Sequence, residues 1–373
     1  MNYVLFVHDH RFKEINNKIY SPGGLSNEIL TRYTNYYGNI KVVARIEKYN
    51  KKDDKFSEIT NKNIEIINYN SLNKKELQKI ILNAQIVILR VPSFLGNKIR
   101  KLIPKDKKYI IEVVACAWDA LWNHSIIGKV IAPIMYYKEK KIVKDAQNVI
   151  YVSNEFLQRR YPNKNYNVGC SDVNVTTIDK DSFNKKRQKK NNKKEKIVLG
   201  TCAALNVKYK GQQYVLKAIS NLKKQGINNI KYELVGGGNH SRLIKLIKKY
   251  KIEDKVEIIG SLPHDKIFDW LDKIDIYIQP SNQEGLCRAL IEAMSRGTPC
   301  IASNAGGNVE LIDEEYIFRR KNVKELQKLI LNMTSNNEIL NQQATSNLKK
   351  AEKYNNKKLE KIRDEFYINV KNK

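Results

Sequence analysis

The chain has 373 residues, of which 42% are hydrophobic and 29% are charged. This composition is typical of a globular protein and excludes a disordered or fibrous chain, and the length favours two domains over a single core. Lys and Arg number 68 against 39 Asp and Glu, and the resulting net charge of +29 favours an anionic partner, unless the lysines are simple surface filling.

The five cysteines are scattered, with no Cys-x-x-Cys pair and no histidine cluster beside them. We therefore expect a reduced, cytoplasmic protein without structural zinc. The longest apolar stretch, residues 126–137, contains Lys129 and is shorter than the roughly 20 residues that a spanning helix needs. No basic flank precedes the first apolar run, so we expect neither a secretory signal nor a transmembrane helix.

Residues 1–184 alternate short β-branched runs with polar segments of helical character, and we predict that they form an N-terminal domain. The predicted strands cover residues 3–7, 41–46, 64–67, 85–91, 109–115 and 148–152. Continuous apolar runs such as IVIL at 86–89 are typical of strands buried on both faces. The pattern therefore predicts an α/β domain with one parallel sheet flanked by helices.

Polar or glycine-containing segments follow two of these strands. Gly23 and Gly24 precede a helix predicted from Ser26, and paired glycines let a backbone approach a phosphate or sugar closely, although an ordinary turn uses the same residues. Asp119 and His124 follow the strand at 109–115. They are candidates for polar groups beside a reacting centre, or for structural roles such as a helix cap.

Two basic stretches stand out in this half of the chain. Residues 126–144 interleave apolar residues and paired tyrosines with lysines, and residues 97–108 read NKIRKLIPKDKK. A basic amphipathic helix of this kind is typical of contact with anionic lipid, and equally of a helix packed on a sheet with a solvated face. The presence of both stretches favours contact with a membrane surface.

Residues 179–196 read DKDSFNKKRQKKNNKKEK and show no apolar periodicity, which predicts a basic linker at 185–196. Aromatic interleaving is almost absent, so the run does not favour nucleic-acid binding. A second domain at 197–345 is predicted with strands at 197–199, 232–235, 256–259, 274–278 and 300–303. From Asn322 to the end the pattern is helical.

Residues 274–313 are the most informative stretch, because they predict a βαβ unit. A first strand ends at Pro280, a turn follows, a helix has an apolar face that begins at Leu286, and a second strand comes after the helix. Ligands bind at the carboxyl end of such a first strand. Glu284 and Glu292 bracket the turn and helix. On a single helix they would lie about 12 Å apart, too far to share a metal or a proton. They would then contact different atoms of one extended ligand, or else Glu284 forms a capping box with Ser281 and Glu292 is a solvated helix glutamate.

The string EGLCRALIEAMSRGTPCIAS, with Pro-Ser before it, closely resembles the signature of the retaining family 4 glycosyltransferases. The segments IEVVACAWDALWNH at 111–124 and VSNEFLQRRYP at 152–162 resemble the bacterial polysaccharide-assembly branch of that family. The resemblance implies two Rossmann-like α/β domains in the GT-B arrangement, with a cleft between them. It also implies that the last helix, in residues 346–373, crosses back to the N-terminal domain.

The resemblance assigns roles to residues of the central stretch. Glu284 would contact hydroxyls of the donor sugar and Glu292 the nucleotide ribose, while the backbone amides of Gly285, Leu286 and Cys287 would face the diphosphate. These roles suit the groups, because carboxylates accept hydrogen bonds from hydroxyls and a helix N-terminus favours anions.

The remaining implied roles lie elsewhere in the chain. Lys210 matches the lysine of a Lys-Gly pair that grips the diphosphate, and Lys208 is the candidate to replace an arginine whose place is taken by Thr201. The Gly23 and Gly24 loop is similar to the donor-proximal loop of the family. Asp119 and His124 are the acceptor-side candidates, since the histidine common in relatives is missing.

The implied reaction transfers a sugar from a UDP- or GDP-linked donor to an acceptor hydroxyl, with retention of configuration. The acceptor would be a lipid-linked saccharide of capsule, exopolysaccharide or lipopolysaccharide assembly, and the enzyme would be peripheral on the inner face of the membrane. No metal or other cofactor is expected, since no Asp-x-Asp motif is placed to bind one. Two alternatives remain open: a nucleotide-sugar epimerase or hydrolase of the same architecture, and a non-catalytic subunit.

Overall fold

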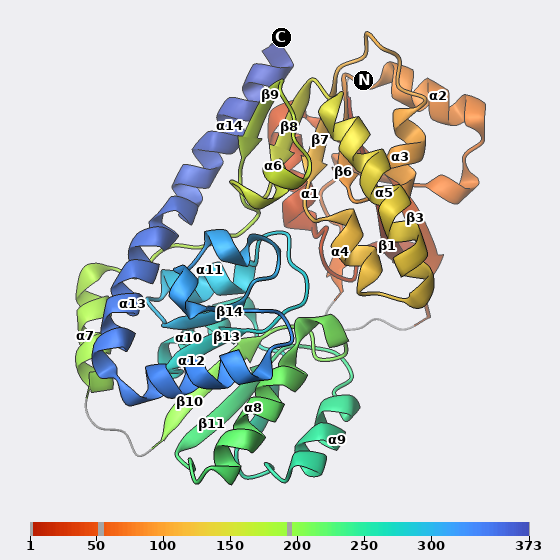
Figure 1. Cartoon of the computed structure of the whole chain (residues 1–373). Coiled ribbons are helices and arrows are strands. Elements are labelled where there is room, and N and C mark those ends of the chain that lie inside the picture. Colours follow the sequence, from red (N-terminus) through yellow and green to blue (C-terminus); the bar gives the residue numbers. More distant parts are fainter. Residues whose placement is uncertain (1–2, 51–55, 192–195, 373) are drawn as a thin grey trace. The chain divides into compact units, whose positions relative to one another are not determined.

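The computed structural model describes residues 3–50, 56–191 and 196–372. The chain forms two compact units, each described by itself below (Figure 1). Unit 1 contains Met1–Leu121, Ile126–Cys170 and Ile362–Lys373, and unit 2 contains Trp122–Ser125 and Ser171–Lys361.

The sheet of unit 1 is mixed but mainly parallel. Its strands are β1 Tyr3–Ile15, β2 Lys18–Ser21, β3 Asn39–Lys48, β4 Ser57–Glu58, β5 Ile64–Asn68, β6 Ile86–Val91, β7 Tyr109–Val113, β8 Asn148–Tyr151 and β9 Tyr166–Gly169. The order β5-β3-β1-β6-β7-β8-β9 is parallel throughout, and β2 and β4 extend it in antiparallel pairing beside β1. Every residue of β6 and β7 is buried, as continuous apolar strands covered on both faces require.

Helices connect these parallel strands. They are α1 Asn27–Tyr37, α2 Lys74–Asn83, α3 Phe94–Arg100, α4 Ala117–Trp122, α5 Ile126–Lys144 and α6 Phe156–Arg160, with a short 3-10 turn η1 at Tyr69–Ser71. Local sequence fixes where several of them begin. The Ser26 side chain caps α1, and Asn73 and Glu76 form a reciprocal capping box on α2.

Unit 2 has a parallel sheet in the order β12-β11-β10-β13-β14-β15. Its strands are β10 Ile197–Cys202, β11 Ile230–Val235, β12 Val256–Gly260, β13 Ile276–Gln279, β14 Cys300–Ser303 and β15 Ile317–Phe318. Its helices are α7 Lys180–Asn191, α8 Gln212–Lys224, α9 Ser241–Tyr250, α10 His264–Lys273, α11 Arg288–Ser295, α12 Val323–Ser335, α13 Asn337–Ala351 and the start of α14 Asn356–Asn372. Short 3-10 turns are η2 Lys208–Lys210, η3 Gly306–Glu310, η4 Glu314–Tyr316 and η5 Glu352–Tyr354.

The predicted fold class, α/β with two parallel-sheet bodies, is confirmed, and each predicted strand is present. The first strand is longer than predicted, because β1 continues past Val7 to Ile15 and turns back into β2. Asn16 and Asn17 form that turn with positive φ, a conformation that asparagine tolerates well.

The basic run predicted as a linker is helical from Lys180 to Asn191. Phe183 explains this, because its ring is buried beside Ile178 and Ala344 and fastens the helix to unit 2. Lys186 adds hydrogen bonds from its ammonium to Asp272 and to the carbonyl oxygen of Arg296. Residues 192–195 of the predicted linker lie outside the described part of the chain.

Helix α14 begins in unit 2 and its residues from Ile362 belong to unit 1. Within unit 1, the Tyr367 hydroxyl donates to the buried carboxylate of Glu112. Tyr33 donates to the same carboxylate, and Arg90 forms an ion pair with it at 3.1 Å. The last helix therefore completes a buried polar cluster at the centre of unit 1.

Among the described helices, none combines the length and the apolar character that crossing a bilayer requires.

Candidate active site

The loop from Pro280 to Cys287 follows β13 at the carboxyl edge of the unit 2 sheet, where ligands bind in parallel α/β folds. Two glycines of other segments hold it. Gly211 has φ +80°, and a Cβ there would lie 1.9 Å from the Pro280 carbonyl oxygen. Gly306 has φ +55°, and a Cβ there would lie 1.8 Å from the Glu284 carbonyl oxygen. Only glycine permits both this backbone conformation and this approach, so the loop is fixed on two sides.

The carboxylate of Glu284 lies at the centre of this loop. Its Oε1 atom accepts hydrogen bonds from Lys210 Nζ at 2.8 Å, the Ser281 hydroxyl at 2.6 Å and the Gln279 amide at 3.2 Å. The Glu284 and Lys210 side chains are 10% and 21% exposed. Within the described residues Oε2 accepts no hydrogen bond, so one carboxylate oxygen is held and the other is available to a ligand hydroxyl.

A relay of buried side chains orients the donors of Glu284. The Tyr277 hydroxyl donates to Gln279 Oε1 at 2.7 Å, and Gln279 Nε2 donates to the Ser281 hydroxyl at 2.7 Å. Tyr277, Gln279 and Ser281 are fully buried. Their packing and hydrogen bonds fix each rotamer, so the Glu284 carboxylate is positioned before any ligand arrives.

Burial and charge act in opposite directions on Lys210. Burial by itself lowers the pKa of the Lys210 ammonium, but neighbouring groups, of which the Glu284 carboxylate acts most strongly, together outweigh burial and raise the pKa above its usual value. Burial, followed by the charge of Glu292, raises the pKa of the Cys202 thiol to about 12, and burial and Glu284 raise the pKa of Cys287. The cation therefore persists at neutral pH, and neither thiol is a thiolate nucleophile.

Glu292 lies on α11 and its side chain is 11% exposed, so its interpretation as a solvated helix glutamate is wrong. Its Oε1 lies 3.3 Å from Nε2 of His264, which begins α10 after the loop at the end of β12. The hydrogen bond to Glu292 raises the pKa of His264 and favours the charged imidazolium. Glu292 is thus a second oriented carboxylate at the same sheet edge.

The short helix α11 begins at Arg288, with Cys287 as its N-cap. Glu284 therefore lies outside the helix, and the capping-box interpretation is wrong, because the Ser281 hydroxyl donates to the Glu284 carboxylate itself. Gly285 and Leu286 form the turn that leads into the helix. The first turn of α11 carries no acidic residue, which suits an anion near its N-terminus.

The position that relatives were expected to fill with arginine is part of the sheet core. Thr201 is fully buried, its hydroxyl donates to the Ile278 carbonyl oxygen at 2.7 Å, and it accepts from the Tyr232 hydroxyl at 2.8 Å. Thr201 therefore replaces a charged group with a structural one. Lys208 lies exposed in η2, the same short turn that carries Lys210.

In unit 1 the predicted glycine loop is open. Gly23 and Gly24 are exposed, and a Cβ at either position would meet no atom within 4 Å. The Ser21 hydroxyl donates to the Gly23 carbonyl oxygen at 2.5 Å, and His10 Nε2 lies 2.9 Å from the same hydroxyl. The loop is thus tied to a histidine of β1.

His10 and its neighbour His8 follow the part of β1 that pairs with β6, so they lie near the carboxyl edge of the unit 1 sheet. Burial and the charge of Arg90 lower the pKa of His8 to about 3 and of His10 to about 4. Both rings are therefore neutral at pH 7, and each can exchange hydrogen bonds with a hydroxyl.

The two acceptor-side candidates are not brought together by either unit. Asp119 lies in the first turn of α4, after the carboxyl end of β7, with its carboxylate 3.9 Å from Arg160. His124 is exposed and belongs to unit 2. Within unit 1, Asp119 therefore lies beside the sheet edge.

Sequence reasoning missed four polar groups of these sites. Gln279 and His264 contact Glu284 and Glu292, while His8 and His10 lie at the sheet edge of unit 1. Three of them carried a signal, because polar residues at the end of an apolar parallel strand point to the ligand edge, as His8, His10 and Gln279 do. His264 follows a loop after β12 and required the three-dimensional contact.

Comparisons with known proteins agree with this arrangement. A family model described as "Glycosyl transferases group 1" matches residues 182–351. The chain is 34% identical to Protein CapJ of Staphylococcus aureus, covering 99% of this chain and 95% of that protein. It is 27% identical to the O-antigen biosynthesis glycosyltransferase WclY of Escherichia coli over 65% of this chain and 64% of that one.

The fold has counterparts among solved structures. HepE of Anabaena, solved in complex with UDP-glucose, superimposes with a TM-score of 0.63 at 15% identity, over the whole length of both chains. At this identity the likeness shows the fold alone. The similarity to CapJ over nearly the full length of both chains, together with the family match, shows that this chain belongs to the group 1 glycosyl transferases.

Proposed function

We propose that this glycosyltransferase moves a sugar from a nucleotide-diphosphate donor to a hydroxyl of a lipid-linked saccharide, with retention of configuration, during cell-surface polysaccharide assembly. The names of relatives support this: WclY is an O-antigen biosynthesis glycosyltransferase and HepE binds UDP-glucose. The proposed donor is linked to UDP or GDP. The proposed location is cytoplasmic, peripheral on the inner face of the membrane.

The pairing of Lys210 with Glu284 at 2.8 Å is the observation that carries the proposal. A sugar joined to a diphosphate presents hydroxyl donors and anionic oxygens within the width of one ring. A fixed carboxylate beside a fixed ammonium matches that arrangement. Glu284 Oε2 accepts a hydrogen bond from a sugar hydroxyl. The Lys210 ammonium offsets the negative charge that develops on the departing diphosphate.

The other donor contacts follow from the same sheet edge. Glu292 accepts a hydrogen bond from a ribose hydroxyl, and His264 fixes the orientation of the Glu292 carboxylate. Lys208 reaches the diphosphate from η2. The backbone amides of Gly285, Leu286 and Cys287 face the phosphates. In this proposal the amides and Lys210 stabilise the leaving group, and no metal ion is required.

We assign acceptor binding to unit 1. Gly23 and Gly24 give the donor-proximal loop, and the polar groups near the sheet edge are Asp119, His8 and His10. Alanine at an acceptor-side residue should raise KM for the acceptor and leave nucleotide affinity unchanged. His124→Ala should leave both unchanged, since His124 is exposed and lies in unit 2.

The test begins with thermal shift against UDP, GDP, ADP and their sugars, with EDTA and again with magnesium. A nucleotide that binds only the folded chain raises Tm by mass action. The donor so found is then incubated with a lipid-linked saccharide, and NMR of the anomeric proton reads the product. The same anomeric configuration as in the donor supports the proposal, and the opposite one contradicts retention. Free sugar without acceptor would indicate a hydrolase, and binding without turnover a non-catalytic subunit.

A further inference from the structure

The outward face of α5 in unit 1 is apolar. Ile126, Ile127, Val130, Ile134 and Tyr137 are each between 53% and 82% exposed. Their spacing of three and four residues places them in one row along the helix. Exposed apolar side chains gathered in a row mark an interaction surface, whereas single ones need no explanation.

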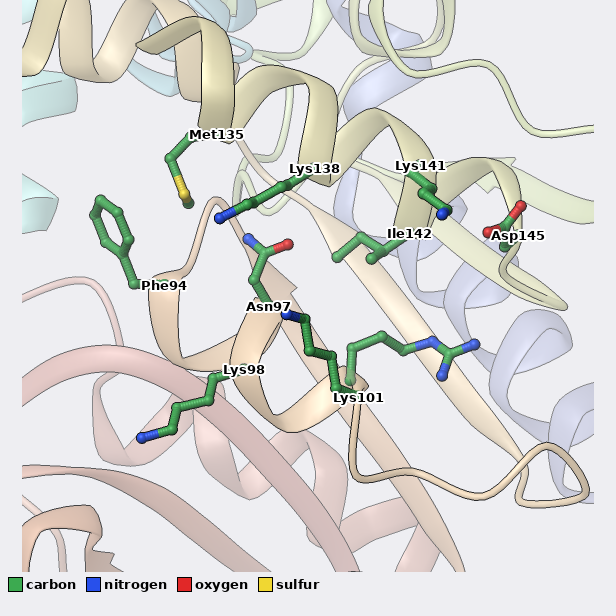
Figure 2. Close-up of a pocket in the computed structure, with 10 residues that line it drawn as sticks. Phe94, Asn97, Lys98, Lys101, Met135, Lys138, Lys141, Ile142 and Asp145 are labelled. Atoms are coloured by element: carbon green, nitrogen blue, oxygen red, sulfur yellow. The ribbon is translucent and has the colours of Figure 1, made fainter. Parts of the chain in front are cut away.

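The row leads directly into a basic groove. Lys138 follows Ile134 by one turn and Lys141 follows Tyr137 by one turn, and both line a groove of about 550 Å³ between α3 and α5. Lys98, Arg100 and Lys101 line it from α3 and its C-terminus. Figure 2 shows Lys138 reaching from α5 toward Asn97 of α3.

Basic residues outnumber acidic ones in the lining of this groove. In the part of the chain that the structure describes, Lys98, Lys101, Lys138 and Lys141 form no ion pair with a carboxylate. Asp145 is the acidic residue of the lining. Glu139 of α5 is buried, and burial raises its pKa to about 8, so it opposes the lysines little at neutral pH.

Part of the lining of the groove is apolar. Phe94, Met135 and Ile142 line it together with the cations, and Phe94 is 48% exposed. Figure 2 shows Met135 and Ile142 coming from α5 above the α3 segment. Apolar side chains beside cations suit a phosphate that carries a hydrocarbon, because the phosphate meets the lysines while the hydrocarbon stays out of water.

We propose that α5 and the α3–α5 groove form a binding surface for an anionic phospholipid membrane. The apolar row enters the boundary between headgroups and acyl chains, and the groove holds the phosphate of one anionic lipid. Charge complementarity favours this occupant over a second copy of the chain, because two copies meeting at this face would bring like charges together. The inference rests on the proposed location at the membrane and does not depend on which sugar is transferred.

The test is flotation of the full chain with phosphatidylcholine vesicles, either alone or containing about a third of phosphatidylglycerol. The groove variant is Lys98→Gln, Lys138→Gln and Lys141→Gln. The control is Lys245→Gln, Lys248→Gln and Lys249→Gln on α9, which removes the same charge from exposed lysines of unit 2. The face variant is Ile127→Ser, Val130→Ser and Ile134→Ser.

The wild-type chain should bind the anionic vesicles and not the neutral ones. Because one lysine near an anionic surface contributes about fivefold in affinity, the groove variant should bind about 100-fold more weakly and the α9 control within about twofold of wild type. The face variant should lose about tenfold or more. Every variant should keep its Tm and its nucleotide binding, since the exchanged side chains are exposed or line the open groove.

Several outcomes would overturn the proposal. One is that the wild type does not bind anionic vesicles. Another is that the α9 control weakens binding as much as the groove variant, because binding would then depend on net charge and not on the groove. Full binding by the face variant would contradict insertion. A dimer in sedimentation velocity that the face variant abolishes would assign the apolar row to a second copy of the chain. Because nucleotide binding is measured separately, failure of the membrane proposal leaves the donor site untouched.

Discussion

At the scale of single residues, the two glutamates could be found from sequence, but their partners could not. Glu284 and Glu292 stand out by their spacing around a turn at the end of a strand. Lys210 lies 74 residues before Glu284 and meets it only because β10 and β13 are neighbours in the sheet. Burial of Thr201 is equally invisible in the sequence, because a threonine after a glycine reads as a loop residue.

Glu284→Gln should lower kcat/KM by about 100- to 1,000-fold, because the amide keeps the shape but loses the charge that accepts the sugar hydroxyl. Initial rates at donor concentrations well below KM, with saturating acceptor, measure this, and circular dichroism checks the fold. The matched control is Glu257→Gln, an exposed glutamate of β12 in the same unit. Near-normal rates for Glu284→Gln would remove Glu284 from the proposed mechanism.

Lys210→Met should destabilise the protein by about 1–3 kcal/mol, because the Glu284 carboxylate would remain largely buried without its cation. The double variant with Glu284→Gln should recover part of that loss, which urea unfolding of both variants measures. The raised pKa of Lys210 means that the pair contributes at every pH below the usual pKa of lysine. The stability difference should therefore stay constant between about pH 6 and 9. A difference that changes over that range would point to another group.

His264 should give unit 2 a pH-dependent stability. Its hydrogen bond to Glu292 raises its pKa in the folded state, so the stabilisation is fully present below the pKa of a free histidine and is lost as pH rises through the folded pKa. The Tm difference between wild type and His264→Ala should thus be larger at about pH 5.5 than at about pH 8. His124→Ala, at an exposed histidine of the same unit, is the control. Equal Tm differences between wild type and His264→Ala at both pH values would exclude a stabilising contact between His264 and Glu292.

At the scale of elements, the alternation of strands and helices can be predicted from the sequence, whereas where an element ends and which extra elements form cannot. The continuous apolar run at β6 and the β-branched residues at 274–278 predict strands, and the structure has both as buried parallel strands, β6 and β13. The extension of β1 into a hairpin with β2 depends on pairing with distant strands. Helix α7 shows the opposite failure: a single buried Phe183 anchors a run whose composition predicts a linker.

Gly306→Ala should cost far more than Gly226→Ala. Both glycines have positive φ, +55° and +84°, so alanine pays a similar backbone penalty of about 1–2 kcal/mol at each. A Cβ at Gly226 meets nothing within 4 Å, whereas at Gly306 it meets the carbonyl oxygen of Glu284. Gly306→Ala should therefore destabilise by about 3 kcal/mol or more and displace the Glu284 loop.

Urea unfolding and donor affinity are measured for both glycine variants. Unfolding reports the loss of stability from backbone strain, and donor affinity reports whether the Glu284 loop has moved. Gly226→Ala should keep wild-type donor affinity despite its loss of stability. If both variants bind donor equally well, the close packing against Gly306 does not position Glu284.

At the scale of the whole molecule, the two bodies could be read from the sequence, whereas the return of the last helix to the N-terminal body was implied only by the family resemblance and not by the pattern of the helix itself. Residues from Ile362 onward belong to that unit. Phe366, Tyr367 and Val370 are buried there, and the pattern of helix α14 alone does not say which body covers them. Their burial makes the folding of unit 1 depend on residues that are separated in sequence from the rest of that unit by the whole of residues 171–361.

This dependence gives the last prediction, which compares two neighbours on α14. Phe366 is fully buried and Ile368 is 50% exposed. Phe366→Ala should therefore lower the stability of unit 1 by about 3–5 kcal/mol, while Ile368→Ala should change it by less than about 0.5 kcal/mol. Hydrogen exchange read by mass spectrometry should show faster exchange in β6 and β7 for Phe366→Ala, with the loop at 280–287 in unit 2 unchanged. Because that loop is held by Gly211 and Gly306 of its own unit, nucleotide binding should survive the loss. Equal exchange in both variants would mean that unit 1 folds without the last helix, and faster exchange at 280–287 would mean that the two units share one cooperative transition.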